Sequence, residues 1–271
     1  ADHLDFFKDI DDIRHSFRRF AQLLPADGTL IINADTPRYE EIIRDLPCNV
    51  ITYGLEQDAD YQAGDITYDK YGHASFSVLR HGVKVGSYYL KVPGIHNVSN
   101  ALAAIALGHL LGLSEDVIIK GLGSFTGTDR RFQYKGQVAG VTIIDDYAHH
   151  PTEIEATLNA AHNYPHNKVW CVFQPHTYTR TKALPPEFAK ALTLADHVVV
   201  ADIYAARETD DLGISSADLQ KRIQELGTPC EYFPTFDEIE NFLLSNCQEG
   251  DLLITMGAGD VVTIGEQLLG K

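Results

Sequence analysis

Short apolar runs alternate with segments of helical character throughout the second half of the chain, and this rhythm limits the possible folds more than any other feature. Continuous apolar runs of this length are typical of strands buried on both faces of a parallel sheet. The alternation predicts a Rossmann-like, doubly wound α/β domain over residues 129–271. The expected strands are Val141–Ile144, Val169–Phe173, His197–Ala201, Leu252–Thr255 and, more weakly, Cys230–Phe233. The expected helices cover residues 151–163, 185–194, 215–226, 236–245 and 260–269.

Residues 1–128 follow a different pattern and are predicted to form a separate domain that ends at a hinge near Gly127–Asp129. Apolar residues spaced by three and four predict a helix over 8–24. Between 65 and 92, apolar and polar residues alternate around a turn at His81-Gly82, which predicts an antiparallel meander. The other expected elements are strands at Leu30–Ile32 and Val50–Tyr53, a helix after Asp35-Thr36-Pro37, an Ala/Leu-rich helix from Asn97 and a short helix between Ser114 and Gly121.

The chain is acidic, with 22 Lys and Arg residues against 38 Asp and Glu residues and a net charge of −16. Such a charge repels phosphate backbones, so nucleic-acid binding is not expected. The longest mostly apolar stretch, residues 101–113, is too short to cross a bilayer, and the N-terminus has no signal-peptide pattern. We therefore expect a cytoplasmic protein that does not bind membranes and keeps its four cysteines as free thiols.

The densest polar cluster, Asp145–Glu153, follows the strand expected at 141–144. In doubly wound folds, this end of a strand and the helix start beside it bind anions. Two adjacent carboxylates, Tyr147 and the pair His149-His150 offer acceptors for hydroxyls, a partner for a metal or its water, and donors for phosphate or carboxylate. The alternative is that an aspartate caps the helix and the histidines are merely exposed.

A second polar loop, Gln174–Lys182, follows the next expected strand, and Arg180 within it can hold a carboxylate or phosphate through two hydrogen bonds. Arg130 and Arg131 follow the hinge, and at most one of them is expected to reach a ligand because adjacent side chains point in different directions. The small residues of Met256–Asp260 allow the backbone either to approach a ligand or to pack closely against a helix.

Weaker candidates lie in the first half of the chain. Asn97 and Asn100, at a helix start, could hydrogen-bond a purine edge, or Asn97 could cap the helix. His3, within ADHLD, could supply a ligand to a divalent metal. The sequence contains no G-x-x-x-x-G-K-[ST], G-x-S-x-G or H-E-x-x-H motif. It also lacks G-x-G-x-x-G after its first Rossmann-like strand, which argues against an NAD-type dehydrogenase.

The run DDYAHHPTEIEATL at 145–158, preceded by GTDRRF and followed by FQPHTYTRTK, resembles the C-terminal domain of the Mur ligase family. PGIHNVSNALAAIALG and the opening ADHLDFF resemble the second half of that family's central ATP-binding domain, and the closing MGAGDV also fits. The resemblance spans the whole chain. It implies a C-terminal ligase domain at 129–271, preceded by part of a central ATP-binding α/β domain at 1–128.

The resemblance implies an ATP-dependent acid–amino-acid ligase of peptidoglycan synthesis, which activates a carboxylate as an acyl phosphate for attack by an amine. The motifs match the branch that joins L-alanine to UDP-N-acetylmuramate, so these are the expected substrates, with ATP and Mg²⁺ as cofactors. A ligase that recycles a murein tripeptide is the alternative within the family.

The resemblance also implies roles for individual residues, and Thr177 stands where some family members have arginine. The expected catalytic residues are His149 and Arg180; the expected substrate-binding residues are Tyr147, His150 and Thr177; the expected ATP-binding residues are Asn97, Asn100, Arg131 and Asp146; the expected metal ligand is His3.

Family members carry a UDP-binding domain, a Gly-rich phosphate loop with a lysine and a metal-binding glutamate before the D-H-L-D motif. None of these occurs in the 271 residues. We therefore expect the C-terminal half of a ligase, completed by upstream domains of the same polypeptide and catalytically silent by itself. The competing hypothesis is a nucleotide- or peptide-binding module that uses the same residues for recognition without catalysis.

Overall fold

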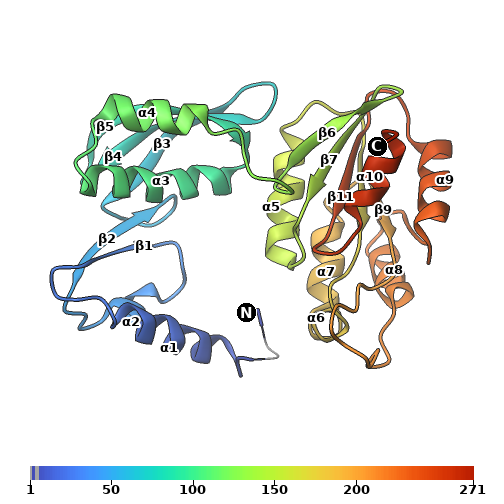
Figure 1. The fold of residues 1–271 in the computed structure, drawn as a ribbon, viewed down its shortest axis with the longest axis horizontal. Helices are drawn as coiled ribbons and strands as arrows, with labels where there is room; N and C mark the ends of the chain where they lie inside the picture. The colour runs from blue at the N-terminus through green and yellow to red at the C-terminus, as the bar shows by residue number, and fades with distance from the viewer. Residues whose placement is uncertain (1, 4–5) are drawn as a thin grey trace. The chain divides into compact units, whose positions relative to one another are not determined.

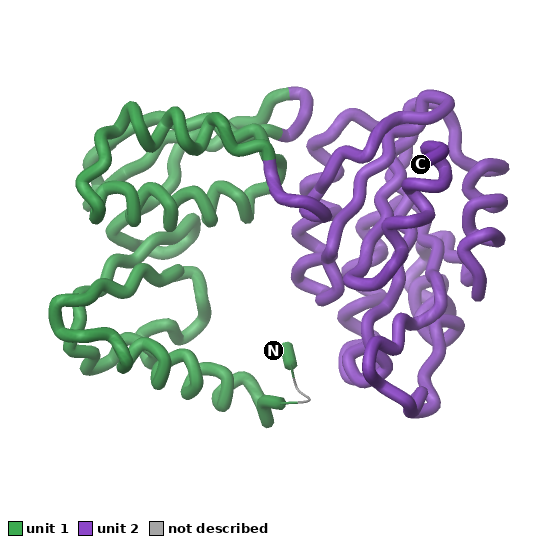
Figure 2. The backbone as a smooth tube through the Cα atoms, viewed as in Figure 1, with its two compact units in different colours: residues 1–69, 73–126 green, residues 70–72, 127–271 purple. Residues whose placement is uncertain are grey.

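The computed structural model describes residues 2–3 and 6–271 of the chain. They form two compact units, each with its own sheet (Figure 1, Figure 2). Unit 1 comprises the described residues up to Asp69 together with His73–Thr126, and unit 2 comprises Lys70–Gly72 together with Gly127–Lys271. Within the described ranges, every helix is either too short or too polar to span a lipid bilayer.

Unit 2 contains a six-stranded sheet in the order β10-β9-β8-β11-β7-β6. Its strands are β6 (Gln133–Val138), β7 (Val141–Asp146), β8 (Val169–Phe173), β9 (His197–Val200), β10 (Cys230–Tyr232) and β11 (Leu252–Met256). Strands β7 to β11 run parallel, whereas the edge strand β6 pairs antiparallel with β7. All five predicted strands are confirmed, but β6 was not predicted, because its sequence QYKGQV has no continuous apolar run. An edge strand tolerates such polar residues since only one side is paired.

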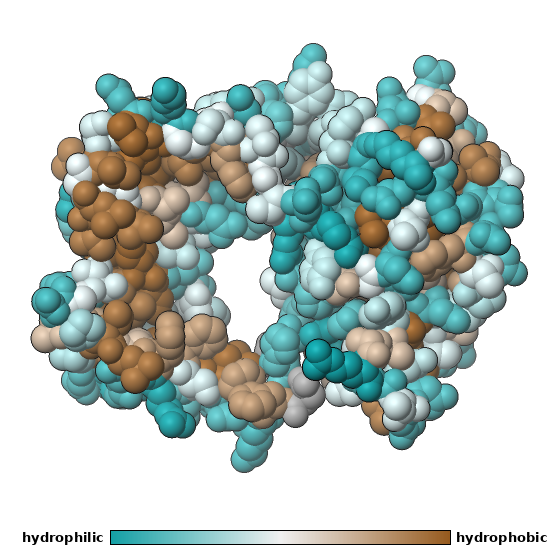
Figure 3. Space-filling view, in the orientation of Figure 1, coloured by the Kyte–Doolittle hydropathy of each residue, from teal (hydrophilic) through white to brown (hydrophobic). Residues whose placement is uncertain are grey.

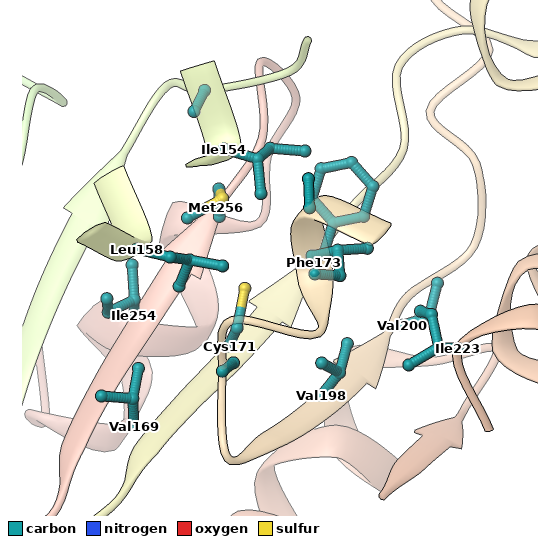
Figure 4. Close-up of a cluster of buried hydrophobic side chains, with 14 of the residues drawn as sticks. Ile154, Leu158, Val169, Cys171, Phe173, Val198, Val200, Ile223, Ile254 and Met256 are labelled. Carbon is teal, nitrogen blue, oxygen red and sulfur yellow. The ribbon is translucent and has the colours of Figure 1, made fainter. Parts of the chain in front are cut away.

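Helices cover both faces of this sheet, which confirms the doubly wound prediction. They are α5 (Pro151–His162), α6 (Tyr178–Ala183), α7 (Pro185–Leu192), α8 (Ser216–Glu225), α9 (Phe236–Asn246) and α10 (Val262–Leu268). Alternate residues of each strand enter different cores: Cys171 and Phe173 pack with α5, α7 and α8 (Figure 4), while Trp170 and Val172 pack with α9 and α10. Every residue of β8 is buried, which explains its continuous apolar sequence.

Helix α6 corrects the expectation that Gln174–Lys182 is a loop, since its second half is helical. The sequence YTRTKA has no apolar periodicity and therefore gave no helical signal. Tertiary contacts hold this short helix instead: Thr181 is buried, the Thr179 N–H donates to Glu208 at 3.0 Å, and Lys182 donates to the Leu212 carbonyl oxygen at 2.7 Å.

Unit 1 contains a five-stranded sheet in the order β1-β2-β3-β4-β5. The strands are β1 (Thr29–Asn33), β2 (Asn49–Gly54), β3 (Tyr61–Tyr68), β4 (His73–Arg80) and β5 (Val83–Pro93); the helices are α1 (Ile10–Ala21), α2 (Tyr39–Ile43), α3 (Ile95–Leu110) and α4 (Glu115–Ser124). The meander prediction is confirmed for β3, β4 and β5. His81 and Gly82 both have positive φ, as a tight hairpin turn requires.

The core of unit 1 forms where α3 lies against the sheet. Leu102 and Ile105 of α3 are fully buried and belong to one cluster with Phe76 and Tyr88 of the meander. Of the four cysteines, Cys48, Cys171 and Cys230 are buried and Cys247 is partly buried.

Candidate active site

A buried ion pair marks the end of β7 in unit 2. Asp145 is fully buried and accepts hydrogen bonds of 2.8 Å from Arg130 Nε and from the Thr255 hydroxyl. The other guanidinium nitrogens of Arg130 donate to the carbonyl oxygens of Gly257 and Gly259, at 2.7 and 3.0 Å. Arg130 therefore ties the end of β7 to the loop after β11, and its guanidinium also lies 4.9 Å from the centre of the Tyr147 ring.

Asp146 also points into the protein. Its two carboxylate oxygens accept hydrogen bonds of 2.8 Å from the backbone N–H groups of Phe132 and Ala148. Burial raises the pKa of Asp146, while these two backbone hydrogen bonds, the Thr157 hydroxyl and nearby Arg131 oppose the rise. The carboxylate thus fixes the two backbone segments that flank the site.

Arg131 is the accessible member of the arginine pair, with 53% of its side chain exposed. Its guanidinium lies 5.8 Å from the centre of the Tyr147 ring, and its closest carboxylate oxygen, on Glu153, is 3.8 Å away. An exposed pair at this distance contributes little to stability. The Arg131 side chain can therefore turn to an anion, whereas that of Arg130 cannot.

His149 is held so that one ring nitrogen stays available. Its Nδ1 lies 2.9 Å from the Tyr147 carbonyl oxygen and 3.3 Å from a carboxylate oxygen of Glu153. Both partners only accept hydrogen bonds, so Nδ1 carries the proton and Nε2 is the basic nitrogen of the neutral ring. The backbone N–H of His149 donates to the same Glu153 oxygen at 3.0 Å, which fixes the loop under the ring.

His150 has a different role, because it caps helix α5. Its Nδ1 accepts from the backbone N–H of Thr152 at 3.4 Å, and its own N–H donates to Glu153 at 3.3 Å. Pro151 follows as the first helical residue, where a proline is favoured. The predicted alternative of a capping aspartate is therefore wrong: the cap is His150.

The loop between β8 and α6 is anchored by Glu208, a residue outside every sequence motif. One carboxylate oxygen accepts from the Thr177 hydroxyl at 2.7 Å and the other from the Thr179 N–H at 3.0 Å. Burial alone would raise the pKa of Glu208, but the hydrogen bonds from Thr177 and Thr179 outweigh it and hold the pKa below its usual value.

His176 and Arg180 form the second half of the site. Arg180 Nη1 donates to the His176 carbonyl oxygen at 2.5 Å and lies 3.3 Å from its Nδ1, while Tyr204 stacks on the His176 ring with centres 5.5 Å apart. Burial, with the charge of Arg180 and the nearby His149, lowers the pKa of His176. The rings of His149 and His176 lie 5.9 Å apart, so the loops after β7 and β8 meet here.

The small residues after β11 serve close packing. A Cβ on Gly257, whose φ is 149°, would lie 2.7 Å from the carbonyl oxygen of Gln174. A Cβ on Gly259 would lie 2.2 Å from the side-chain oxygen of Gln174 and 2.8 Å from Tyr204. Gln174 in turn donates to Asp260 at 2.8 Å. Both glycines therefore pack closely within the protein, mainly against the loop residues Gln174 and Tyr204 and not against a helix as the sequence analysis expected.

The remaining predicted site residues lie in unit 1. Asn97 donates its amide to the carbonyl oxygen of Pro93 at 2.8 Å, and the exposed Asn100 donates to Asn97 at 3.3 Å. The side chain of His3 is 67% exposed and lies 3.6 Å from Asp2. In the part of the chain that the structure describes, no three His, Cys, Asp or Glu side chains gather as a metal site would require.

Three site residues were absent from the sequence-based set: His176, Tyr204 and Glu208. His176 stands inside the QPHTYTR motif, so its position already signalled it. Tyr204 and Glu208 follow β9, the next parallel strand, and the rule that ligand sites lie at the carboxyl ends of strands could have found them.

Two family models match the chain. One, described as the Mur ligase middle domain, matches residues 1–108, and the other, described as the Mur ligase glutamate ligase domain, matches residues 130–259.

A curated UDP-N-acetylmuramate--L-alanine ligase of Agathobacter rectalis is 59% identical over 271 residues, which cover 100% of this chain and 59% of the relative. The crystal structure of a UDP-N-acetylmuramate-alanine ligase from Thermotoga maritima is 27% identical with a TM-score of 0.79, covering 100% of this chain and 57% of that one. The structure of a murein peptide ligase from Psychrobacter arcticus is 25% identical with a TM-score of 0.67, covering 97% of this chain and 55% of that one. The chain spans about three fifths of the length of the curated relatives that it matches.

Proposed function

This chain belongs to the Mur ligase family, and we propose that it is the part of an ATP-dependent ligase that binds L-alanine and helps to join it to UDP-N-acetylmuramate in the cytoplasm. The observation that carries the proposal is the meeting of His149 and His176 at the ends of β7 and β8, with two cations beside them. Arg131, which precedes β6, lies near Tyr147, and Arg180 of α6 lies against His176. The printed name of the Agathobacter rectalis relative supports this choice of substrates.

Amide formation needs a base for the attacking amine and cations for the carboxylates. The free Nε2 of His149 is suited to take the proton that the amine loses. Arg180, placed by His176, is suited to hold the carboxylate of the amino acid. Tyr147, His150 and Thr177 shape the same edge of the sheet and remain predicted substrate contacts.

The residues present fit ATP in part. Arg131 fits a phosphate group, because its guanidinium is exposed and lightly held. Asn100 is exposed and suits a purine edge, whereas the amide of Asn97 is committed to Pro93. Asp146 has both oxygens committed to backbone N–H groups and is better suited to position the loop than to contact a ligand. ATP supplies the phosphoryl group that activates the carboxylate.

The residues present do not fit a Mg²⁺ site on their own. His3 has Asp2 as its only acidic neighbour within ion-pair distance among the described residues, and an imidazole is a poor ligand for this ion compared with oxygen. Mg²⁺ therefore stays a prediction that rests on the family resemblance, and we assign no step to a metal held by this chain.

The direct test is phosphate release from ATP in the presence of UDP-N-acetylmuramate and L-alanine. We expect no release from the chain alone, and release from the chain joined to the part of the Agathobacter rectalis relative that it does not match. Omission of L-alanine is the control. Turnover by the chain alone would refute its predicted silence. A joined enzyme that uses a murein tripeptide in place of L-alanine would favour the recycling ligase, and one without any turnover would favour the binding module.

The two adjacent histidines give a sharper test in the joined enzyme. His149→Ala should lower kcat about 10²- to 10⁴-fold, the usual effect of losing a general base. His150→Ala is the comparison variant: as the helix cap and a predicted substrate contact, it should cost about 1 kcal/mol of stability and change KM more than kcat. Equal and small losses of rate in both variants would remove the role that we assign to His149.

A further inference from the structure

A polar cavity of about 380 Å³ lies in unit 1 between α1 and α2, within one compact unit and lined by residues from sequence segments that no functional motif includes. Its size falls within the roughly 300–1,000 Å³ of small-ligand pockets. Four arginines line it: Arg14, Arg18, Arg38 and Arg44.

The charge of this cavity is opposite to that of the chain. Its four guanidinium groups face two carboxylates, Asp11 and Glu41, which leaves an excess of two positive charges in a protein whose net charge is −16. The ring of His15, at the same wall, can add a third positive charge when protonated. Such a concentration of arginine attracts small anions.

Two of the arginines build the frame of the cavity. Arg18 donates to the carbonyl oxygens of Glu41 and Arg44, at 3.0 and 2.5 Å, and so fixes the end of α2 against α1. Arg38 holds Glu41 with two hydrogen bonds of 2.7 and 2.9 Å and donates a third to Asp11 at 2.9 Å. Both carboxylates are thereby neutralised by groups within the wall.

The other cationic groups of the cavity, Arg14, Arg44 and His15, have N–H donors that are not used by the described part of the protein. Arg14 uses one nitrogen for Asp11 at 2.6 Å, while 15% of its side chain is exposed. Across the described ranges, the Arg44 guanidinium and the His15 ring have no hydrogen-bond or ion-pair partner. A cavity with unused guanidinium donors on two walls matches an anion with several oxygen atoms, because arginine binds phosphate through paired N–H groups.

We propose that the cavity between α1 and α2, built within unit 1 alone, is a binding site for a pyrophosphate group, either free or carried by a nucleoside diphosphate. Arg14 of α1 and Arg44, directly after α2, bind the anion from opposite walls, and Arg18 and Arg38 hold the two helices in place. The proposal does not depend on the proposed ligase activity.

The test titrates inorganic pyrophosphate into the full chain and follows backbone amide shifts by NMR. We expect saturable shifts confined to α1 and α2, and binding that weakens as the salt concentration rises. Arg44→Gln should weaken binding about tenfold, the effect expected for one charge-assisted hydrogen bond. Arg19→Gln is the matched control, since it removes the same charge from α1 outside the cavity and should leave the affinity unchanged.

Two further arms complete the test. If Arg44→Gln unfolds the chain, His15→Gln replaces it, because the His15 ring is exposed and holds no other group. ADP binding with the same α1 and α2 shifts would identify the nucleotide as the source of the group, and binding of pyrophosphate alone would identify the free anion. Equal weakening by Arg19→Gln and Arg44→Gln, shifts only in unit 2, or no saturable binding would each overturn the proposal.

Discussion

Unit 2 covers its own sheet, whereas unit 1 leaves much apolar surface exposed. All residues of β8 and β11 in unit 2 are buried, but the five residues of the edge strand β1 are only half-buried. On α1, Phe17 and Phe20 are 59% and 71% exposed. Figure 3 shows apolar side chains gathered over unit 1, while the visible face of unit 2 is mostly polar. Large exposed apolar patches are typical of surfaces that take part in interactions, so the two units differ in how much of their apolar surface they bury themselves.

Core truncation should give the largest contrast between the two units. Phe173→Ala removes a fully buried ring from unit 2 and should lower the free energy of unfolding by about 4 kcal/mol. Phe20→Ala in unit 1 should change it by less than about 0.5 kcal/mol, because that ring is exposed. The fluorescence of Trp170, the only tryptophan, follows unit 2 in urea titrations, and circular dichroism follows both units.

The control for this contrast is Phe76→Ala, which removes a buried ring from the core of unit 1. This variant should lower the free energy of unfolding of unit 1 by as much as Phe173→Ala lowers that of unit 2. The urea midpoint of Trp170 fluorescence, which follows unit 2, should stay unchanged. If Phe20→Ala proved as costly as Phe76→Ala, the exposed face of unit 1 would be packed in solution and the comparison would fail.

Replacing the two adjacent arginines of unit 2 by alanine should lower the free energy of unfolding by amounts that differ nearly as much. Arg130→Ala leaves the buried Asp145 without its cation, so we expect a loss of about 3 kcal/mol in the Trp170 transition. Arg131→Ala removes an exposed side chain and should cost less than about 0.5 kcal/mol. Similar losses for both variants would contradict the division of labour between these two residues.

Two glycine substitutions contrast close packing in unit 2 with open space in unit 1. Gly259→Ala would press a methyl group against Gln174 and Tyr204 and should cost about 1–3 kcal/mol. Gly121→Ala in α4 meets nothing within 4 Å and should stabilise the chain by about 0.5–1 kcal/mol through helix propensity. Thermal unfolding of the two variants measures both effects, and a stabilising Gly259→Ala would show that this turn is loosely packed.

The smallest expected effect is on the stability of unit 2 at acidic pH. The pKa of Glu208 in the folded state is below the ordinary 4.5, so its hydrogen bonds stabilise unit 2 above that value and are lost as the pH falls through the folded-state pKa. The difference in stability between the chain and Glu208→Gln should therefore shrink below about pH 4.5. Urea midpoints between pH 3 and 7, again from Trp170 fluorescence, measure it. A constant difference would mean that Glu208 acts without its charge.

The family resemblance and the alternation of strands and helices predicted the parallel strands and most helices of unit 2, together with the polar motifs at the strand ends. Burial on both faces requires apolar residues at every position of β8, so that strand was recognisable from residue types alone. Strand β6 and helix α6 were missed because partners elsewhere in the chain stabilise them. Thr177, at the start of α6, needs Glu208, which lies 31 positions later.

The sequence by itself determined which residue types stand at the ends of the parallel strands, because chain order and apolar periodicity are local properties. Only the tertiary structure decided which of two adjacent, chemically similar residues stabilises the fold and which stays available to a ligand. Arg130 is committed because Asp145, Gly257 and Gly259 converge on it, and Arg131 is left at the surface. A hydrogen bond depends on the position of both partners, and folding brings most of these partners together from distant parts of the chain.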